Sequence, residues 1–119
     1  MANRTGRRLA LVLLLLACAL GAGCAEERPA ILVQDTTISV ENQGREAWSA
    51  IEVWLNDHYR VTARTLEPDG RLVVPLDAFV AGFGQRFDRR HQAPFGIEVT
   101  ARTASGKEVR LVWGKGRRR

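Results

Sequence analysis

The sequence predicts an all-β domain, an antiparallel β-sandwich of about seven strands, behind a removable N-terminal segment. Three observations predict this arrangement. Short segments alternate apolar and polar residues, turn-forming residues separate them, and an unbroken apolar run follows three arginines at the start. We divide the chain into a signal peptide (1–23), a mature start and linker (24–30), the sandwich (31–114) and a basic tail (115–119).

The first segment has the three parts of a secretory signal peptide. A basic start with three arginines precedes the aliphatic run Leu9–Leu16, and small residues at 21–23 form the exit. The apolar stretch is shorter than the roughly 20 residues that a membrane-spanning helix needs. We therefore expect export from the cytoplasm and removal of this segment.

Two cysteines close this segment, and their surroundings resemble the lipobox of bacterial lipoproteins, in which a cysteine becomes the acylated first residue. Cys24 follows a full apolar stretch and precedes a polar start, so we expect the lipid there. Cys18 has the better local match, with Leu15 three residues before it, but leaves a short apolar run; cleavage without lipid is a third alternative. In the lipoproteins that this motif resembles, an Asp after the acylated cysteine favours inner-membrane retention; Ala25 stands there instead, so the resemblance implies the outer membrane if the cell has one.

The strands follow from period-two alternation, in which every second residue faces the core. Turn signals separate them at 42–44, 68–70 and 105–106. The residues expected to face the core are Ile38, Val40, Ile51, Val53, Leu55, Tyr59, Val61, Ala63, Leu72, Val74, Leu76, Ile97, Val99, Ala101, Val109, Leu111 and Trp113. Short alternating segments with turn-forming residues between them predict an antiparallel sandwich or barrel.

The register of one hairpin follows from its side-chain pattern. Cross-strand partners must share a face, so the apolar triplets 51/53/55 and 59/61/63 must lie opposite each other. A three-residue loop at 56–58 achieves this and pairs Leu55 with Tyr59. The same register pairs Trp54 with Arg60 on the outer face.

The segment 77–95 departs from alternation. Asp77 is a candidate cap for one turn, and Phe79 and Phe83 are four residues apart, which would place them on one helical face. Gly82 and Gly84 limit any helix. We expect a short helix or 3₁₀ turn followed by a loop through Phe95.

The opening pattern of Val40, Asn42 and Gly44, followed by the strand Ile51-x-Val-x-Leu55, resembles small immunoglobulin-like domains of bacterial envelope proteins, such as the FxLYD group. The segment 66–70 before the next strand fits the same plan, and the resemblance covers residues 36–113. The Leu-Tyr-Asp signature is replaced by Leu-Asn-Asp at 55–57. The resemblance implies fold and envelope location and no particular chemistry.

The charge distribution argues against a nucleic-acid-binding domain. From Cys24 onward, 15 Lys and Arg oppose 13 Asp and Glu, and four of the cations lie in the tail 115–119. The remaining domain is close to neutral, whereas a nucleic-acid-binding domain carries a basic stripe on one face. We expect no nucleic-acid partner.

The chemically reactive residues form no catalytic or metal constellation. His58 and His91 are far apart in sequence and no cysteine follows Cys24, whereas a metal site needs three or four converging ligands. Asp88 lies near His91, but no nucleophile accompanies them; Ser105 belongs to a turn. We expect no enzyme activity, no metal and no cofactor.

Basic residues gather in one loop, at Arg86, Arg89 and Arg90, and in the tail 115–119. Both groups have two interpretations. They are either contacts for anionic lipid headgroups or a polyanion, or solvated charges that nearby acids such as Asp88 offset.

Two tryptophans suggest a binding face. If Val53 and its apolar neighbours face the core, Trp48 and Trp54 point outward on the same face, where Arg60 lies beside Trp54. In the alternative, residues 77–95 cover this face, or Trp54 stacks on Arg60 as a cation–π pair.

We therefore expect a lipid-anchored extracytoplasmic protein of the cell envelope that serves as a non-catalytic binding or structural module. Its expected partners are the membrane, through the N-terminal lipid, and an envelope protein or polysaccharide. The alternative is an accessory subunit of an envelope complex, docking through the face of Trp48, Trp54 and Arg60; an enzyme is a distant third.

Overall fold

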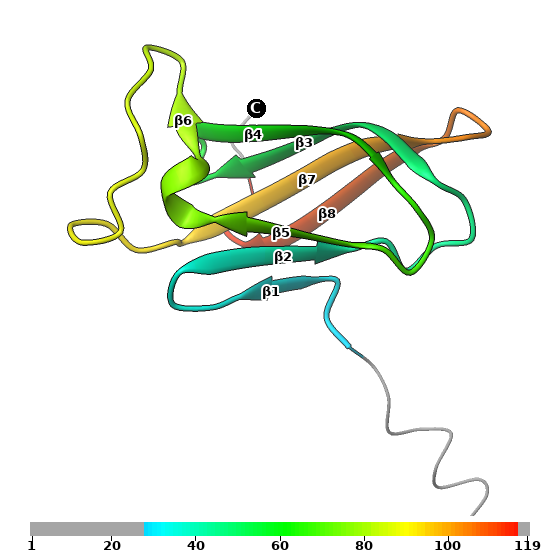
Figure 1. Cartoon of the computed structure of the whole chain (residues 1–119), viewed down its shortest axis with the longest axis horizontal. Coiled ribbons are helices and arrows are strands. Elements are labelled where there is room, and N and C mark those ends of the chain that lie inside the picture. The colour runs from blue at the N-terminus through cyan, green and yellow to red at the C-terminus, as the bar shows by residue number, and fades with distance from the viewer. Residues whose placement is uncertain (1–27, 117–119) are drawn as a thin grey trace, which may run out of the picture.

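A computed structural model describes residues 28–116 of the 119-residue chain. The predictions for the signal peptide, for acylation at Cys24 or Cys18 and for the tail beyond residue 116 lie outside the described residues. The described chain folds into two antiparallel sheets packed face to face (Figure 1). The predicted β-sandwich is thereby confirmed.

The smaller sheet has the strand order β1-β2-β5. It consists of β1 (Ile31–Val33), β2 (Thr37–Glu41) and β5 (Arg71–Pro75). Ile38 pairs with Val33 on one side and with Val74 on the other, so one apolar row crosses the sheet.

The larger sheet has the order β6-β4-β3-β7-β8. Its strands are β3 (Trp48–Leu55), β4 (Tyr59–Leu66), β6 (Val80–Ala81), β7 (Gly96–Thr103) and β8 (Glu108–Gly114). The chain crosses between the two sheets after β2, β4 and β5, so each sheet combines strands from separate parts of the sequence. The described residues hold eight strands rather than about seven, because β1 and β6 are too short to reveal alternation.

The core lies between the sheets and takes residues from both. The side chains at its centre, each less than 2% exposed, are Ile38, Val40, Ile51, Val53, Leu55, Leu76, Phe79, Ile97 and Val99. The apolar positions of β8 (Val109, Leu111 and Trp113) pack against this core while half-buried. The predicted inward sets are therefore confirmed, and Val61, Ala63 and Leu72 lie with β8 at the partly buried margin of the core.

The predicted hairpin register is also confirmed. Leu55 pairs with Tyr59 and Trp54 with Arg60. The loop at 56–58 turns because Asn56 and Asp57 adopt positive φ angles of 51° and 67°; Asn and Asp tolerate this region better than most residues. The side chain of Asn56 is buried and fixes the residues that lead into β7. Its Oδ1 accepts a hydrogen bond from Phe95 N at 2.8 Å, and its Nδ2 donates to Ala93 O at 3.0 Å.

The prediction that Phe79 and Phe83 share one face of a helix is wrong. A 3₁₀ helix, η1 (Leu76–Ala78), is present, but its N-cap is Pro75 and Asp77 does not cap it. The chain becomes extended at Phe79, so Phe79 is buried and Phe83 is 84% exposed. Phe87 returns to the core, where its ring meets Tyr59 edge-on at 5.3 Å.

The outward orientation predicted for Trp48 is wrong. Trp48 is 5% exposed and belongs to the core. The cause is a β-bulge: the register between β3 and β7 shifts between Ser49 and Glu52, and Ala50 has a φ of 50°. Both Ser49 and Ala50 are exposed, so the alternation changes phase and returns Trp48 to the inner face.

Candidate functional site

The outer face of the larger sheet carries ordered rows of side chains. One row runs Arg60, Trp54, Glu98 and Val112 across β4, β3, β7 and β8. Of the residues predicted for a partner face, the structure brings Trp54 and Arg60 together here and places Trp48 in the core.

Trp54 is held in a network of charged neighbours. The Arg60 guanidinium carbon lies 5.4 Å from the centre of the Trp54 ring, and Arg60 Nη1 lies 3.2 Å from Glu52 Oε1. The predicted cation–π pair is therefore present. On the other side of Trp54, Glu98 is 2% exposed and accepts a hydrogen bond from Arg110 Nε at 3.2 Å.

The segment 77–95 flanks this face. β6 extends the sheet beyond β4 by pairing Tyr59 with Ala81 and Arg60 with Val80. A recess of about 500 Å³ remains at this edge; Trp54, His58, Arg60, Thr62, Val80, Ala81 and Gly82 line it. We call it the Trp54 recess. Trp54 is half-buried beside it, with Arg60 over its ring.

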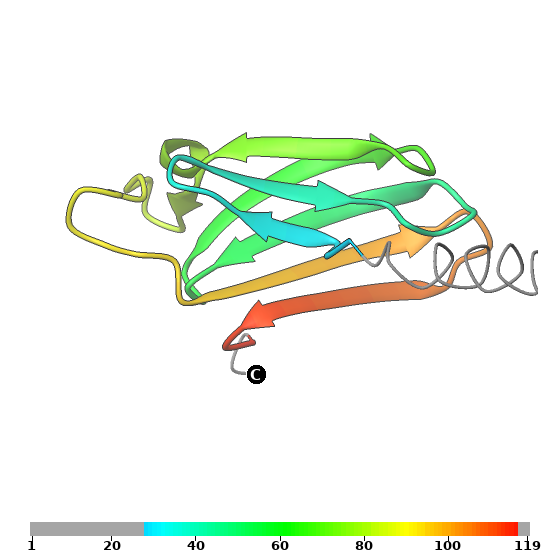
Figure 2. The same ribbon diagram turned by 90° about the horizontal axis from the view of Figure 1, so that it is seen from below.

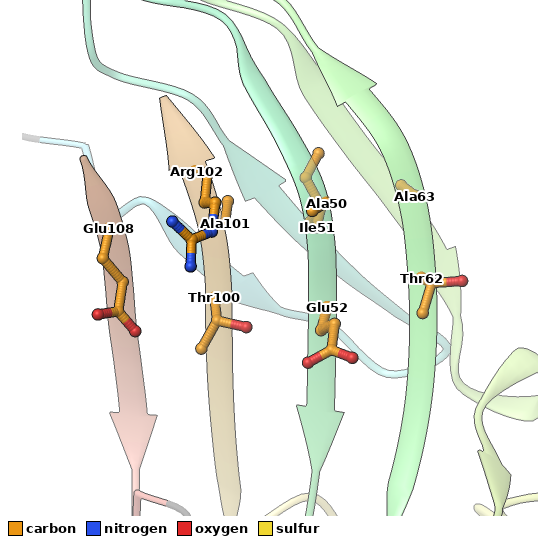
Figure 3. A pocket seen from close by; sticks show the side chains of 9 residues that line it. All are labelled: Ala50, Ile51, Glu52, Thr62, Ala63, Thr100, Ala101, Arg102 and Glu108. Atoms are coloured by element: carbon orange, nitrogen blue, oxygen red, sulfur yellow. The ribbon is translucent and has the colours of Figure 1, made fainter. Parts of the chain in front are cut away.

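A second hollow, the bulge depression, lies on the same face where β3 bulges (Figure 3). Its volume is about 380 Å³, and its lining residues are Ala50, Ile51, Glu52, Thr62, Ala63, Thr100, Ala101, Arg102 and Glu108. Thr62 also lines the Trp54 recess, so the two hollows adjoin. Carboxylate, hydroxyl and guanidinium groups here can hydrogen-bond a polar ligand.

The bulge depression is not apparent from the sequence. Its polar residues occur as ordinary outward positions of four different strands, and the hollow depends on a shift against β7 at Ala50. The one available signal was the small side chain of Ala50 between larger neighbours, which is too common to indicate a bulge.

The two histidines lie apart and both are exposed. His58 is in the hairpin loop. His91 Nδ1 lies 2.7 Å from Asp88 Oδ2, and the backbone N–H of Arg90 donates to Asp88 Oδ1 at 3.0 Å. The hydrogen bond from His91, followed by that from Arg90, lowers the pKa of Asp88.

The predicted basic loop is solvent-exposed at Arg86, Arg89 and Arg90. Asp88 lies within it and is also exposed, so one acid partly offsets these charges. Within residues 28–116, no three His, Cys, Asp or Glu side chains converge as a metal site would require.

Among the described residues, none of the helices has the length and apolar character needed to cross a membrane.

No protein-family model matches the chain, and no curated protein matches it. One solved structure is similar to it, the NMR structure of a protein from Eubacterium rectale. The two chains share 23% identity, the match covers 77% of each, and the TM-score is 0.49.

Proposed function

We propose that this protein is a membrane-anchored extracytoplasmic lipoprotein whose β-sandwich is a non-catalytic binding or structural module of the cell envelope. The observation that carries the proposal is the position of Cys24, directly behind a signal-like apolar run and seven residues before β1 begins at Ile31. Only six residues separate Cys24 from this strand. After Cys24 the sequence has no cysteine, so the domain folds without a disulfide.

A specific observation favours the alternative of an accessory subunit that docks through the larger sheet. The Trp54 recess and the bulge depression adjoin at Thr62, beside an aromatic ring and charged groups. Aromatic and arginine side chains are enriched where proteins bind partners. An envelope protein or a polysaccharide fits this surface as a partner.

Mass spectrometry of the mature N-terminus tests the anchoring proposal. We expect the chain to start at a diacylglyceryl-modified Cys24, and Cys24→Ser to release the protein from membranes into the soluble fraction. Cys18→Ser is the matched control and should leave the lipid in place. A mature chain that starts at Cys18, or a Cys24→Ser protein that still carries lipid, contradicts the proposal.

A further inference from the structure

The outer face of the smaller sheet differs from that of the larger one. Its central row is Leu32, Ser39 and Val73, which are paired across β1, β2 and β5. Leu32 is 40% exposed and Val73 is 55% exposed. Ser39 is buried between them. This row therefore presents two aliphatic side chains to the surroundings.

Basic groups border this row. Glu41 lies one row away and is buried, with Arg28 Nη2 at 3.4 Å and Arg71 Nη2 at 3.3 Å from its two oxygens. One carboxylate thus faces two guanidinium groups, and both arginine side chains remain at least half exposed. The cluster keeps a net positive charge that can meet an anion.

A small groove joins the apolar row to the basic cluster. Its volume is about 120 Å³, and it is lined by Arg28, Pro29, Ala30, Leu32, Ser39, Glu41 and Arg71. Aliphatic side chains beside exposed arginines are the combination that protein surfaces use at the boundary between lipid headgroups and acyl chains.

The chain enters the domain at this face. Gln43 Nε2 donates to Arg28 O at 2.8 Å, and Arg28 also contacts Glu41, so residue 28 is fixed on the smaller sheet. Figure 2 shows the described chain beginning beside β1. Only four residue steps separate Arg28 from Cys24, a reach of at most about 14 Å. A lipid on Cys24 would therefore hold this sheet close to the bilayer.

We propose that the outer face of the smaller sheet lies on the membrane, with Leu32 and Val73 at the headgroup boundary and Arg28 and Arg71 beside anionic headgroups. This inference rests on the proposed acylation of Cys24. It leaves the larger sheet, with the Trp54 recess and the bulge depression, facing away from the membrane.

The test uses the full mature acylated protein in vesicles of phosphatidylethanolamine and phosphatidylglycerol. A polarity-sensitive fluorophore is attached at Val73→Cys and, in a second protein, at Val112→Cys. These residues are matched, because both are exposed valines on outer faces, 55% and 45% exposed, on opposite sheets. We expect a headgroup-level quencher to quench the label at residue 73 several-fold more strongly than the label at 112.

Each other outcome overturns the inference. Equal quenching at both positions means that the domain has no preferred face, and stronger quenching at residue 112 means that the larger sheet faces the membrane. The N-terminal mass separates the two proposals. If Cys24 is not acylated, both the anchoring proposal and this inference are wrong. If the protein is acylated but the label at residue 73 is not quenched, only this inference is wrong.

A label at a second position of the smaller sheet is the control for a local effect of the fluorophore. Leu32→Cys lies in the same cross-strand row and should give the same quenching as Val73→Cys. Both residues project outward, so we expect the labelled proteins to keep the melting temperature of the parent. A quenched label at residue 73 with an unquenched label at 32 contradicts a sheet that lies flat.

Discussion

Trp48 and Trp54 share strand β3 but differ in environment. Trp48 is 5% exposed in the core, whereas Trp54 is half-buried under Arg60. We expect Trp48→Ala to lower the free energy of unfolding by about 3–5 kcal/mol, as for other buried aromatic residues. Trp54→Ala should cost about 1–2 kcal/mol, from lost partial burial and the cation–π contact.

Urea denaturation of both variants checks this difference. Arg60→Gln is the control for Trp54→Ala, because it removes the cation and leaves the ring in place; its effect should be the smaller of the two. Equal losses for Trp48→Ala and Trp54→Ala would contradict the bulge that separates their environments.

Asp88 titrates differently from an isolated carboxyl group. Its pKa is lowered by the hydrogen bonds from His91 and from Arg90 N–H. The small stabilisation from this carboxylate is present above the ordinary pKa of Asp and is lost as the pH falls through the lowered value. We expect His91→Ala to raise the NMR titration midpoint of Asp88, part of the way only, because Arg90 N–H remains.

His58→Ala is the matched control for this titration. His58 lies in the hairpin loop, apart from the hydrogen bonds that His91 and Arg90 N–H donate to Asp88, so its removal should leave the midpoint where it is. A midpoint in His91→Ala that equals that of the parent protein would show that the His91 contact does not form in solution.

At the scale of the element, the bulge in β3 determines which residues of this strand lie on the outer face of the larger sheet. Ala50 adopts a φ of 50°, a conformation that costs a residue with a β-carbon about 1–2 kcal/mol. Ala50→Gly removes this cost but gains freedom in the unfolded chain. We expect it to change stability by between zero and a gain of about 1 kcal/mol.

Ala50→Val is the contrasting variant. A β-branched side chain at positive φ is strained, so we expect a loss of about 1–3 kcal/mol in urea denaturation. At an ordinary exposed strand position, valine would be favoured over glycine. If Ala50→Val is the more stable of the two variants, residue 50 does not have this conformation.

The elements that sequence analysis predicted are those with local signals. The hairpin register followed from alternation, because only one loop length aligns Leu55 with Tyr59. The bulge gave no such signal, since it depends on the pairing of β3 with β7, which is distant in sequence. Trp48 was misplaced for this reason, and the bulge depression was missed. The pair of Trp54 and Arg60 lies beyond the bulge, where the alternation holds.

Tertiary packing also decided the positions of the phenylalanines. Phe79 and Phe83 have helical spacing, but η1 ends at Ala78 and the chain then runs along the edge of β4. Phe79 and Phe87 fill the core while Phe83 is left exposed. Local spacing could not predict this, because the edge of β4 competes with the helix for the backbone hydrogen bonds of residues 80–81.

At the scale of the whole molecule, the two outer faces differ in character. The larger sheet presents paired charges, such as Glu52 with Arg60, around hollows that can receive a polar ligand. The smaller sheet presents Leu32 and Val73. Because the two faces are unlike, one can contact an apolar or anionic surface while the other binds a polar partner.

One core joins both sheets, and this determines how the molecule should unfold. Residues of the smaller sheet, such as Ile38, and of the larger, such as Val53, belong to the same buried cluster, so neither sheet has an apolar face of its own to bury without the other. We expect a single cooperative thermal transition, with circular dichroism and tryptophan fluorescence giving the same midpoint. Because the sequence after Cys24 has no cysteine, a reducing agent should not shift that midpoint. Separate midpoints for the two probes would show that the sheets unfold independently, and a shift on reduction would show a cross-link that involves a cysteine at or before residue 24.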